Sequence, residues 1–131
     1  EIIISENPAA ACAKAAEAVK MQVLAKGSSV LGLATGGTVL GLYENLAKMR
    51  AAGEVSFKKV STFNLDEYVG MPASDPNSYR AFMEKHLFSK IDIDPSNAHI
   101  PDGRAENIRA YCVQYENKKG FAVESTCRYW E

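Results

Sequence analysis

Paired cysteines, net charge and long apolar runs are all scarce in this sequence of 131 residues. Its three cysteines, Cys12, Cys112 and Cys127, lie far apart and form no CxxC or CxH pattern, which argues against a zinc site and a disulfide framework. With 15 basic and 16 acidic residues, no field over the whole surface would attract nucleic acid or an anionic membrane. We therefore expect reduced thiols, no bound metal, and a small molecule rather than a polymer or a membrane as the partner.

The N-terminus also lacks the charged-then-apolar layout of a secretory signal, and no apolar run is long enough to span a bilayer. These absences predict a cytoplasmic location. At this length we expect one domain with a single core. Because the chain begins with Glu1 rather than Met, we expect the printed sequence to be a fragment.

Apolar periodicity predicts an alternation of strands and helices along the chain. Asn7-Pro8 is a plausible cap and first-turn pair for the first helix, and Gly53 is suited to closing the second. This alternation is typical of an α/β fold with a parallel sheet flanked by helices. The predicted strands are residues 29–33, expected to be buried, and 59–64; the predicted helices are 8–25, 38–52, 78–89 and about 105–118, with a loop over 91–104.

A glycine-rich turn, Thr35-Gly36-Gly37-Thr38, joins the first predicted strand to the next helix. Backbone N–H groups at such a turn point outward at the positive end of the helix dipole, and glycine lets a ligand approach the main chain. The two threonines add hydroxyl donors, so the turn is suited to binding phosphate. It matches neither the Walker A nor the GxGxxG pattern, and the alternative is a tight connection without a ligand.

An acidic turn, Asp66-Glu67-Tyr68, follows the second predicted strand. In open parallel sheets, ligands bind outside the carboxyl ends of the strands, so both turns would lie on one rim. A carboxylate beside a bound phosphosugar could act as a general base. The alternative is a helix cap or a solvated acidic turn.

Three blocks, "LGLATGGTVLGLYENL", "VSFKKVSTFNLDEYVGM" and "DPNSYRAFMEKHLF", resemble the N-terminal half of the glucosamine-6-phosphate deaminase family, also called glucosamine-6-phosphate isomerase. The resemblance runs from near the N-terminus to about Lys118. Related enzymes such as 6-phosphogluconolactonase share the fold and the glycine-rich turn but do not usually show "FNLDEY" and "NSY". The resemblance implies a Rossmann-like fold, incomplete at the C-terminus, and cofactor-independent hydrolysis of glucosamine 6-phosphate to fructose 6-phosphate and ammonia in amino-sugar catabolism.

The resemblance also implies roles for individual residues. Gly36, Gly37 and Thr38 would contact the phosphate, and Thr35 would shape the same turn. Asp66 matches the aspartate that in this family moves a proton between C2 and C1 of the sugar.

Four other residues receive weaker expectations. Glu67 falls in the substrate-binding motif, and we expect it to hold the turn rather than to do chemistry. Tyr79 matches a tyrosine beside the family's active site, although the pattern alone favours a partly buried aromatic on a helix about equally. His86 is expected to be a packed or surface residue, and His99 lies in the predicted loop with no visible partner.

The later family block resembling "GHIGFNEP", with the ring-opening histidine, does not occur in this sequence, and neither do the later lysine and arginine that clamp the phosphate. We therefore expect the chain to be inactive or nearly so. The alternatives are a non-catalytic phosphosugar-binding module, a galactosamine-6-phosphate deaminase or a 6-phosphogluconolactonase. Members of the family are often homo-oligomers.

The predicted family domain covers residues 1–118, and the tail at 119–131 does not look like the family. Read from the third base of each codon, however, the tail can spell "GGIDLQVLG", which resembles the strand expected next. This agreement favours a single-base deletion near the codons of Lys118 and Lys119 over a divergent natural terminus.

Overall fold

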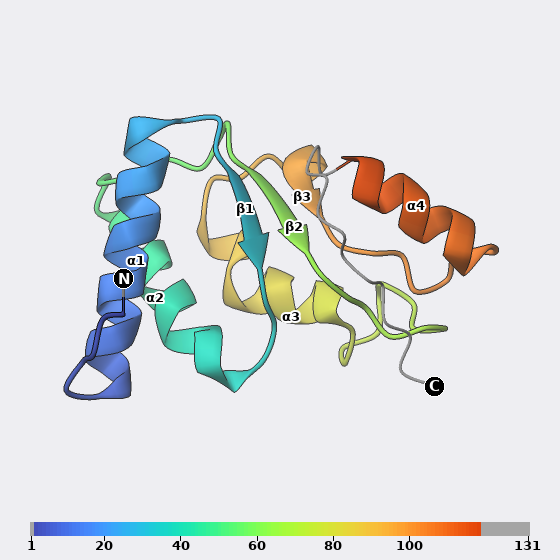
Figure 1. Ribbon diagram of the computed structural model, residues 1–131, viewed down its shortest axis with the longest axis horizontal. Helices are drawn as coiled ribbons and strands as arrows, with labels where there is room; N and C mark the ends of the chain where they lie inside the picture. Colours follow the sequence, from blue (N-terminus) through green and yellow to red (C-terminus); the bar gives the residue numbers. More distant parts are fainter. Residues whose placement is uncertain (1, 119–131) are drawn as a thin grey trace.

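The computed structural model describes residues 2–118 (Figure 1), so the predictions for the tail and its reading frame lie outside the described residues. Strands and helices alternate along the chain, as the sequence predicts. The helices are α1 (Pro8–Ala25), α2 (Leu40–Ala51), α3 (Tyr79–His86) and α4 (Ile108–Lys118); the strands are β1 (Val30–Leu33), β2 (Ser61–Asn64) and β3 (Ala98–His99).

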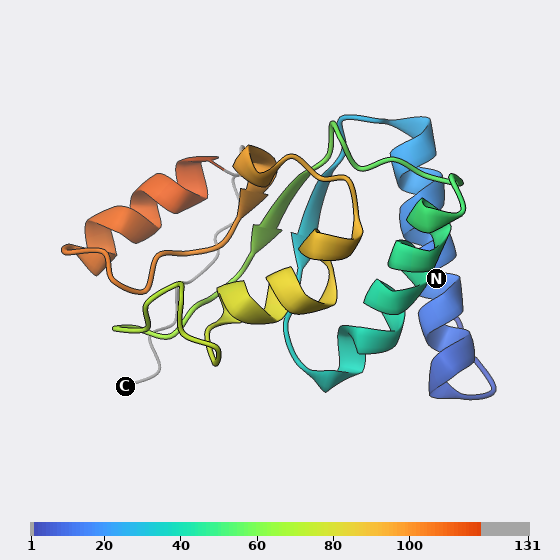
Figure 2. The ribbon, with the colours of Figure 1, turned by 180° about the vertical axis from the view of Figure 1, so that it is seen from behind.

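The strands form one parallel sheet in the order β1-β2-β3, with Val30 opposite Ser61 and Thr62 opposite Ala98. Helices α2 and α3 lie behind this sheet in Figure 1 and in front of it in Figure 2. The predicted α/β class is therefore confirmed. In Figure 1, β1 and β2 point toward the same edge of the sheet, which places the two turns that follow them on one rim.

Several predicted boundaries are wrong by one to a few residues, for local reasons. Ser78 is the cap of α3 and not its first residue, because its Oγ accepts the backbone N–H of Ala81 at 3.0 Å. Asn107 accepts the N–H of Ala110 in the same way, so α4 begins after it. The second predicted helix begins with a 3-10 turn over Gly37–Val39 before α2.

Two further predictions need correction. The first strand is not fully buried, since Val30 is 40% exposed on the edge strand β1. The predicted loop over 91–104 contains a 3-10 turn, Pro95–Asn97, and the short strand β3. By contrast, Asn7 caps α1 as expected, accepting the N–H of Ala10 at 2.8 Å, and Gly53 follows α2 with φ +75°.

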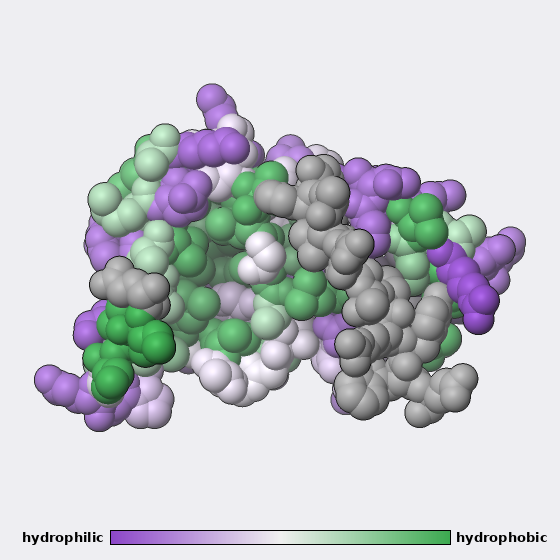
Figure 3. All heavy atoms as spheres, in the orientation of Figure 1, coloured by the Kyte–Doolittle hydropathy of each residue, from purple (hydrophilic) through white to green (hydrophobic). Residues whose placement is uncertain are grey.

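The core lies between α2, α3 and the sheet, with α1 packed on α2. Gly41 allows this packing, because a Cβ there would lie 2.9 Å from Cys12 Sγ on α1. Figure 3 shows hydrophobic residues gathered over the opposite face of the sheet, where β1 and β2 lie. None of the helices within residues 2–118 is both long enough and apolar enough to cross a bilayer. The fully buried large side chains include Tyr43, Leu46, Phe57, Val60, Met83 and Leu87.

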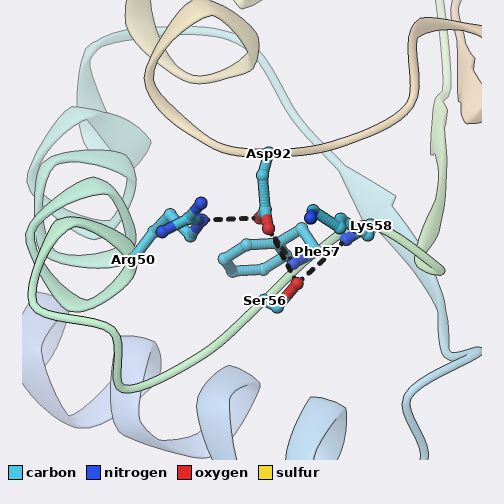
Figure 4. A network of polar contacts seen from close by, with 5 residues as sticks. All are labelled: Arg50, Ser56, Phe57, Lys58 and Asp92. Atoms are coloured by element: carbon cyan, nitrogen blue, oxygen red, sulfur yellow. Dashed lines mark hydrogen bonds and ion pairs between the residues drawn. The ribbon is translucent and has the colours of Figure 1, made fainter.

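A polar network around Asp92 joins α2 to the segment before β2 (Figure 4). The Asp92 carboxylate accepts the backbone N–H of Phe57 at 2.8 Å and the Ser56 hydroxyl at 2.7 Å, and it pairs with Arg50 Nε at 2.9 Å. Burial alone would raise the pKa of Asp92. The hydrogen bonds from Phe57, Ser56 and Arg50 outweigh burial and lower it.

Candidate functional site

The phosphate turn connects β1 to α2 through backbone that only glycine adopts easily. Gly36 has φ +111°, which disfavours any side chain there. Apart from its neighbours in the chain, a Cβ added at Gly36 or Gly37 would meet no atom of the described residues within 4 Å, so the space above the main chain is open in this part of the structure. The buried Tyr43 fixes the start of the turn, because its hydroxyl donates to the carbonyl of Ala34.

The helical segment after this turn keeps its positive end available. Within residues 2–118, no side-chain hydrogen bond caps the N-terminus of the 3-10 turn Gly37–Val39 or of α2, and neither has an acidic residue in its first turn. Thr38 is exposed beside these N–H groups. Backbone donors, an uncompensated helix dipole and a nearby hydroxyl together suit an anion such as phosphate.

The acidic turn begins two residues beyond the last residue of β2, with Asp66. Its side chain is exposed, and no hydrogen bond to its carboxylate occurs within residues 2–118. Partial burial raises the pKa of Asp66, and the negative charge of Glu67 raises it further. A carboxylate of this kind is a better proton acceptor near neutral pH than an ordinary aspartate.

Glu67 binds the N-terminus of α3. Its Oε1 accepts the N–H groups of Tyr68 and Tyr79, and its Oε2 accepts that of Arg80, each at 3.0 Å. Both carboxylate oxygens are thus engaged by the backbone, as expected for a residue that holds the turn. Its assignment to substrate binding stays a prediction.

Tyr79 brings the two turns together. Its ring lies 4.7 Å from that of Tyr68, and its hydroxyl donates to the Tyr68 hydroxyl at 3.1 Å. This hydrogen bond, with partial burial and the charge of Asp66, raises the pKa of Tyr79 to about 12, whereas the Thr35 hydroxyl acts in the opposite direction. Residues of both turns therefore lie around the Tyr79 hydroxyl.

Two positions that the sequence analysis missed also fix the site. The Tyr115 hydroxyl, from α4, lies 2.9 Å from the carbonyl oxygen of Asn64 and 3.1 Å from that of His99, at the ends of β2 and β3. Gly103 accepts the N–H of Gly70 at 2.7 Å. The spacing of the aromatic residues in α4 could have pointed to Tyr115, but no local signal marks Gly103.

The histidines do not join the site. His99 packs against Phe63 with ring centroids 4.4 Å apart, and His86 packs against Phe82 at 4.6 Å. Burial lowers the pKa of His99, and the charges of Lys118 and Arg80 lower it further. Within residues 2–118, no group of three or more histidine, cysteine or acidic side chains is placed to hold a metal ion.

A cavity of about 340 Å³ lies beside the acidic turn, and Glu67, Arg80 and Tyr111 are among the residues that line it. The phosphate turn contributes nothing to its walls. The open space beside Gly36 and Gly37 is therefore a better candidate for the phosphate than this cavity.

Comparisons with known proteins show the family of the chain. Residues 5–125 match the family described as glucosamine-6-phosphate isomerases/6-phosphogluconolactonase. Glucosamine-6-phosphate deaminase of Halothermothrix orenii is 46% identical over 117 residues, which are 89% of this chain and 48% of that protein. Glucosamine-6-phosphate deaminase 2 of Bacillus subtilis is also 46% identical, over 89% of this chain and 47% of that protein.

Solved structures of related enzymes have the same fold. The structure of a monomeric glucosamine-6-phosphate deaminase superimposes with a TM-score of 0.87 at 36% identity, covering 90% of this chain and 49% of that one. A 6-phosphogluconolactonase from Thermotoga maritima has a TM-score of 0.69 at 21% identity, over 94% of this chain and 54% of that one, and shows the fold alone. The chain spans about half the length of the curated relatives it matches.

Proposed function

Since this chain belongs to the family of glucosamine-6-phosphate isomerases and 6-phosphogluconolactonases, we propose that it carries the phosphate-binding turn and the proton-transferring carboxylate of a glucosamine-6-phosphate deaminase. The observation that carries the proposal is the meeting of the two turns around Tyr79. The names of the relatives support an amino-sugar phosphate as the substrate.

In this proposal the phosphate of the sugar lies over Gly36 and Gly37, where a Cβ would meet open space. The N–H groups at the start of the helical segment and the Thr38 hydroxyl donate to its oxygens. This binding would fix the sugar relative to the acidic turn on the same rim. Fixing the reacting carbon beside a base lowers the entropic cost of the proton transfer.

Asp66 would then take the proton from C2 of the open-chain sugar and return it to C1. This transfer, with the movement of one proton from nitrogen to O1, gives a sugar with a hydroxyl at C1 and an imine at C2. Water then adds to C2 and the C2–N bond breaks, so that glucosamine 6-phosphate and water give fructose 6-phosphate and ammonia. The raised pKa of Asp66 suits a group that must both accept and give a proton. Tyr79 would lie beside the substrate as a hydroxyl contact.

Neutral donors alone surround the phosphate turn in the sequence, since no lysine or arginine occurs between Lys26 and Lys48. A phosphate dianion held without cations is bound less tightly than one with them. We therefore propose that this chain binds the phosphosugar weakly, and that full turnover needs cationic and acid–base groups besides those described.

Ligand titration of the 131-residue chain tests the proposal. We expect glucosamine 6-phosphate to shift the backbone amide resonances of residues 35–39, and glucosamine without phosphate to leave them in place. Gly37→Val should weaken this binding by about tenfold or more, since the valine side chain fills the space proposed for the phosphate. The φ of Gly37 lies outside the left-handed region, so a valine at this position does not cause the backbone strain that a side chain would cause at Gly36.

An unshifted phosphate turn, or equal binding by the Gly37→Val variant, would contradict the proposed phosphate site. Ammonia release, measured on the same samples, separates an enzyme from a phosphosugar-binding module. Parallel titrations with galactosamine 6-phosphate and 6-phosphogluconate compare the amino-sugar substrates with the ligand class of the related lactonases.

A further inference from the structure

Glu67 makes an unusually long-range helix cap. Its two carboxylate oxygens accept the N–H groups of Tyr79 and Arg80, which follow it by 12 and 13 residues, at the N-terminus of α3. Ser78 supplies the local cap at the same helix end, through the N–H of Ala81. The helix therefore has a satisfied N-terminus in which Glu67 joins two segments that are distant in sequence.

The same carboxylate also closes its own turn, because Oε1 accepts the N–H of Tyr68. Asp66 directly precedes this clamped segment. Two further contacts hold the turn from outside: the N–H of Gly70 donates to the carbonyl of Gly103 at 2.7 Å, and the Tyr68 hydroxyl meets that of Tyr79. The backbone beside Asp66 is thus attached to α3 and to the segment before α4, while the Asp66 carboxylate itself is left without a hydrogen bond in the described chain.

We propose that Glu67 is a positioning residue for Asp66: it ties the acidic turn to the first turn of α3 and thereby fixes where the Asp66 carboxylate meets the sugar. This inference rests on the proposed function. It gives Glu67 a role through its neighbour and no contact with the substrate.

The charge of Glu67 has a second effect on the same neighbour. Three backbone N–H groups hold the Glu67 carboxylate in place in the residue directly after Asp66. That charge disfavours ionisation of Asp66 and adds to the effect of partial burial. Tyr79 from α3 also interacts with Asp66, and it is neutral below its own raised pKa.

Two measurements on the whole chain test the proposal without needing turnover. Carboxyl ¹³C NMR follows the titration of Asp66, and amide hydrogen exchange follows the N–H groups of Tyr79 and Arg80. For Glu67→Gln we expect the Asp66 titration midpoint to move downward, and exchange at the two amides to become about tenfold faster or more, because one oxygen acceptor and the charge are lost. Asp92→Asn is the matched control, since Asp92 also accepts a backbone N–H but lies in a different network.

Glu67→Asp separates position from charge. Its shorter side chain keeps the charge but does not reach both N–H groups, so exchange should accelerate while the Asp66 midpoint stays above that of Glu67→Gln. The proposal is overturned if Glu67→Gln changes neither readout, or if Asp92→Asn moves the Asp66 midpoint equally. Unchanged readouts with lost phosphosugar binding would instead make Glu67 a substrate contact. If Glu67→Gln gives both expected changes but the wild-type chain binds no phosphosugar, the proposed function is contradicted while the link between Glu67 and Asp66 stands.

Discussion

Asp66 and Asp92 place the same type of side chain in two contrasting environments of one small fold. Asp92 accepts a backbone N–H and a hydroxyl, pairs with Arg50, and has a lowered pKa. Asp66 accepts no hydrogen bond within residues 2–118 and has a raised pKa. A carboxylate that is fully engaged stabilises the fold, whereas one that is held in place but left unengaged is available for chemistry.

The contacts that hold the backbone around Asp92 and around Asp66 differ accordingly. At Asp92 the aspartate itself is the link between α2 and the segment before β2. At Asp66 the neighbours make the links, through the Glu67 carboxylate, the Tyr68–Tyr79 contact and the Gly70–Gly103 hydrogen bond. The structure thus separates the group that would react from the groups that position it.

The largest loss of stability should come from disrupting the packing of the acidic turn against Gly103. A Cβ at this position would lie 2.1 Å from the carbonyl oxygen of Tyr68, which is backbone and has no rotamer to change. We expect Gly103→Ala to lower the free energy of unfolding by about 3 kcal/mol, as for other overpacked positions. Urea denaturation measures this.

Gly27→Ala is the control for Gly103→Ala, because a Cβ at Gly27 would meet no atom of residues 2–118 within 4 Å apart from its chain neighbours. It should change the free energy of unfolding by less than about 0.5 kcal/mol. If the two variants were equally stable, the acidic turn would not be clamped as described.

The next effect concerns the engaged aspartate. In the wild type, the negative charge of Asp92 pairs with Arg50 and also strengthens the hydrogen bonds from Ser56 and Phe57. Because Asp92→Asn removes this charge, it should lower the free energy of unfolding by about 2 kcal/mol at neutral pH. Because the folded pKa is lowered, this stabilisation is present above the unfolded pKa of about 4 and is lost as the pH falls through the folded pKa. The difference between wild type and variant, measured by urea denaturation, should therefore shrink on acidification. A difference that stayed constant down to strongly acidic pH would mean that the charge of Asp92 does not matter.

The sequence could predict the two turns because each is a local feature. Gly36 and Gly37 follow one apolar run, and Asp66 follows another, so strand ends and turn chemistry are visible in a short window. The alternation of helices and strands is equally local, and it gives the parallel α/β class.

The contacts that make these turns a site could not be predicted in this way. The partner of Glu67 is a helix end more than ten residues later, and Gly103 matters only because the Tyr68 carbonyl approaches it in three dimensions. The third strand was missed because it has two residues and follows Pro95 in a segment rich in turn signals. Tertiary contacts decide each of these cases.

The smallest effect should separate the two aspartates most clearly. Asp66→Asn should change the free energy of unfolding by less than about 0.5 kcal/mol. At neutral pH the change should be an increase in the free energy of unfolding. The reason is that the folded chain raises the pKa of Asp66, so the ionised carboxylate destabilises the folded state at a pH above this raised pKa. When the pH falls through the raised pKa, Asp66 is protonated and this destabilisation is lost.

Urea denaturation at several pH values would show the contrast with Asp92→Asn: both differences from wild type shrink in acid, but they have opposite signs at neutral pH. Phosphosugar binding should persist in Asp66→Asn, because the phosphate turn is untouched. A clear loss of stability at neutral pH would show instead that Asp66 is an engaged carboxylate like Asp92, and the proposed base would have to be sought elsewhere. The sign of this small difference therefore decides whether the two aspartates have distinct purposes.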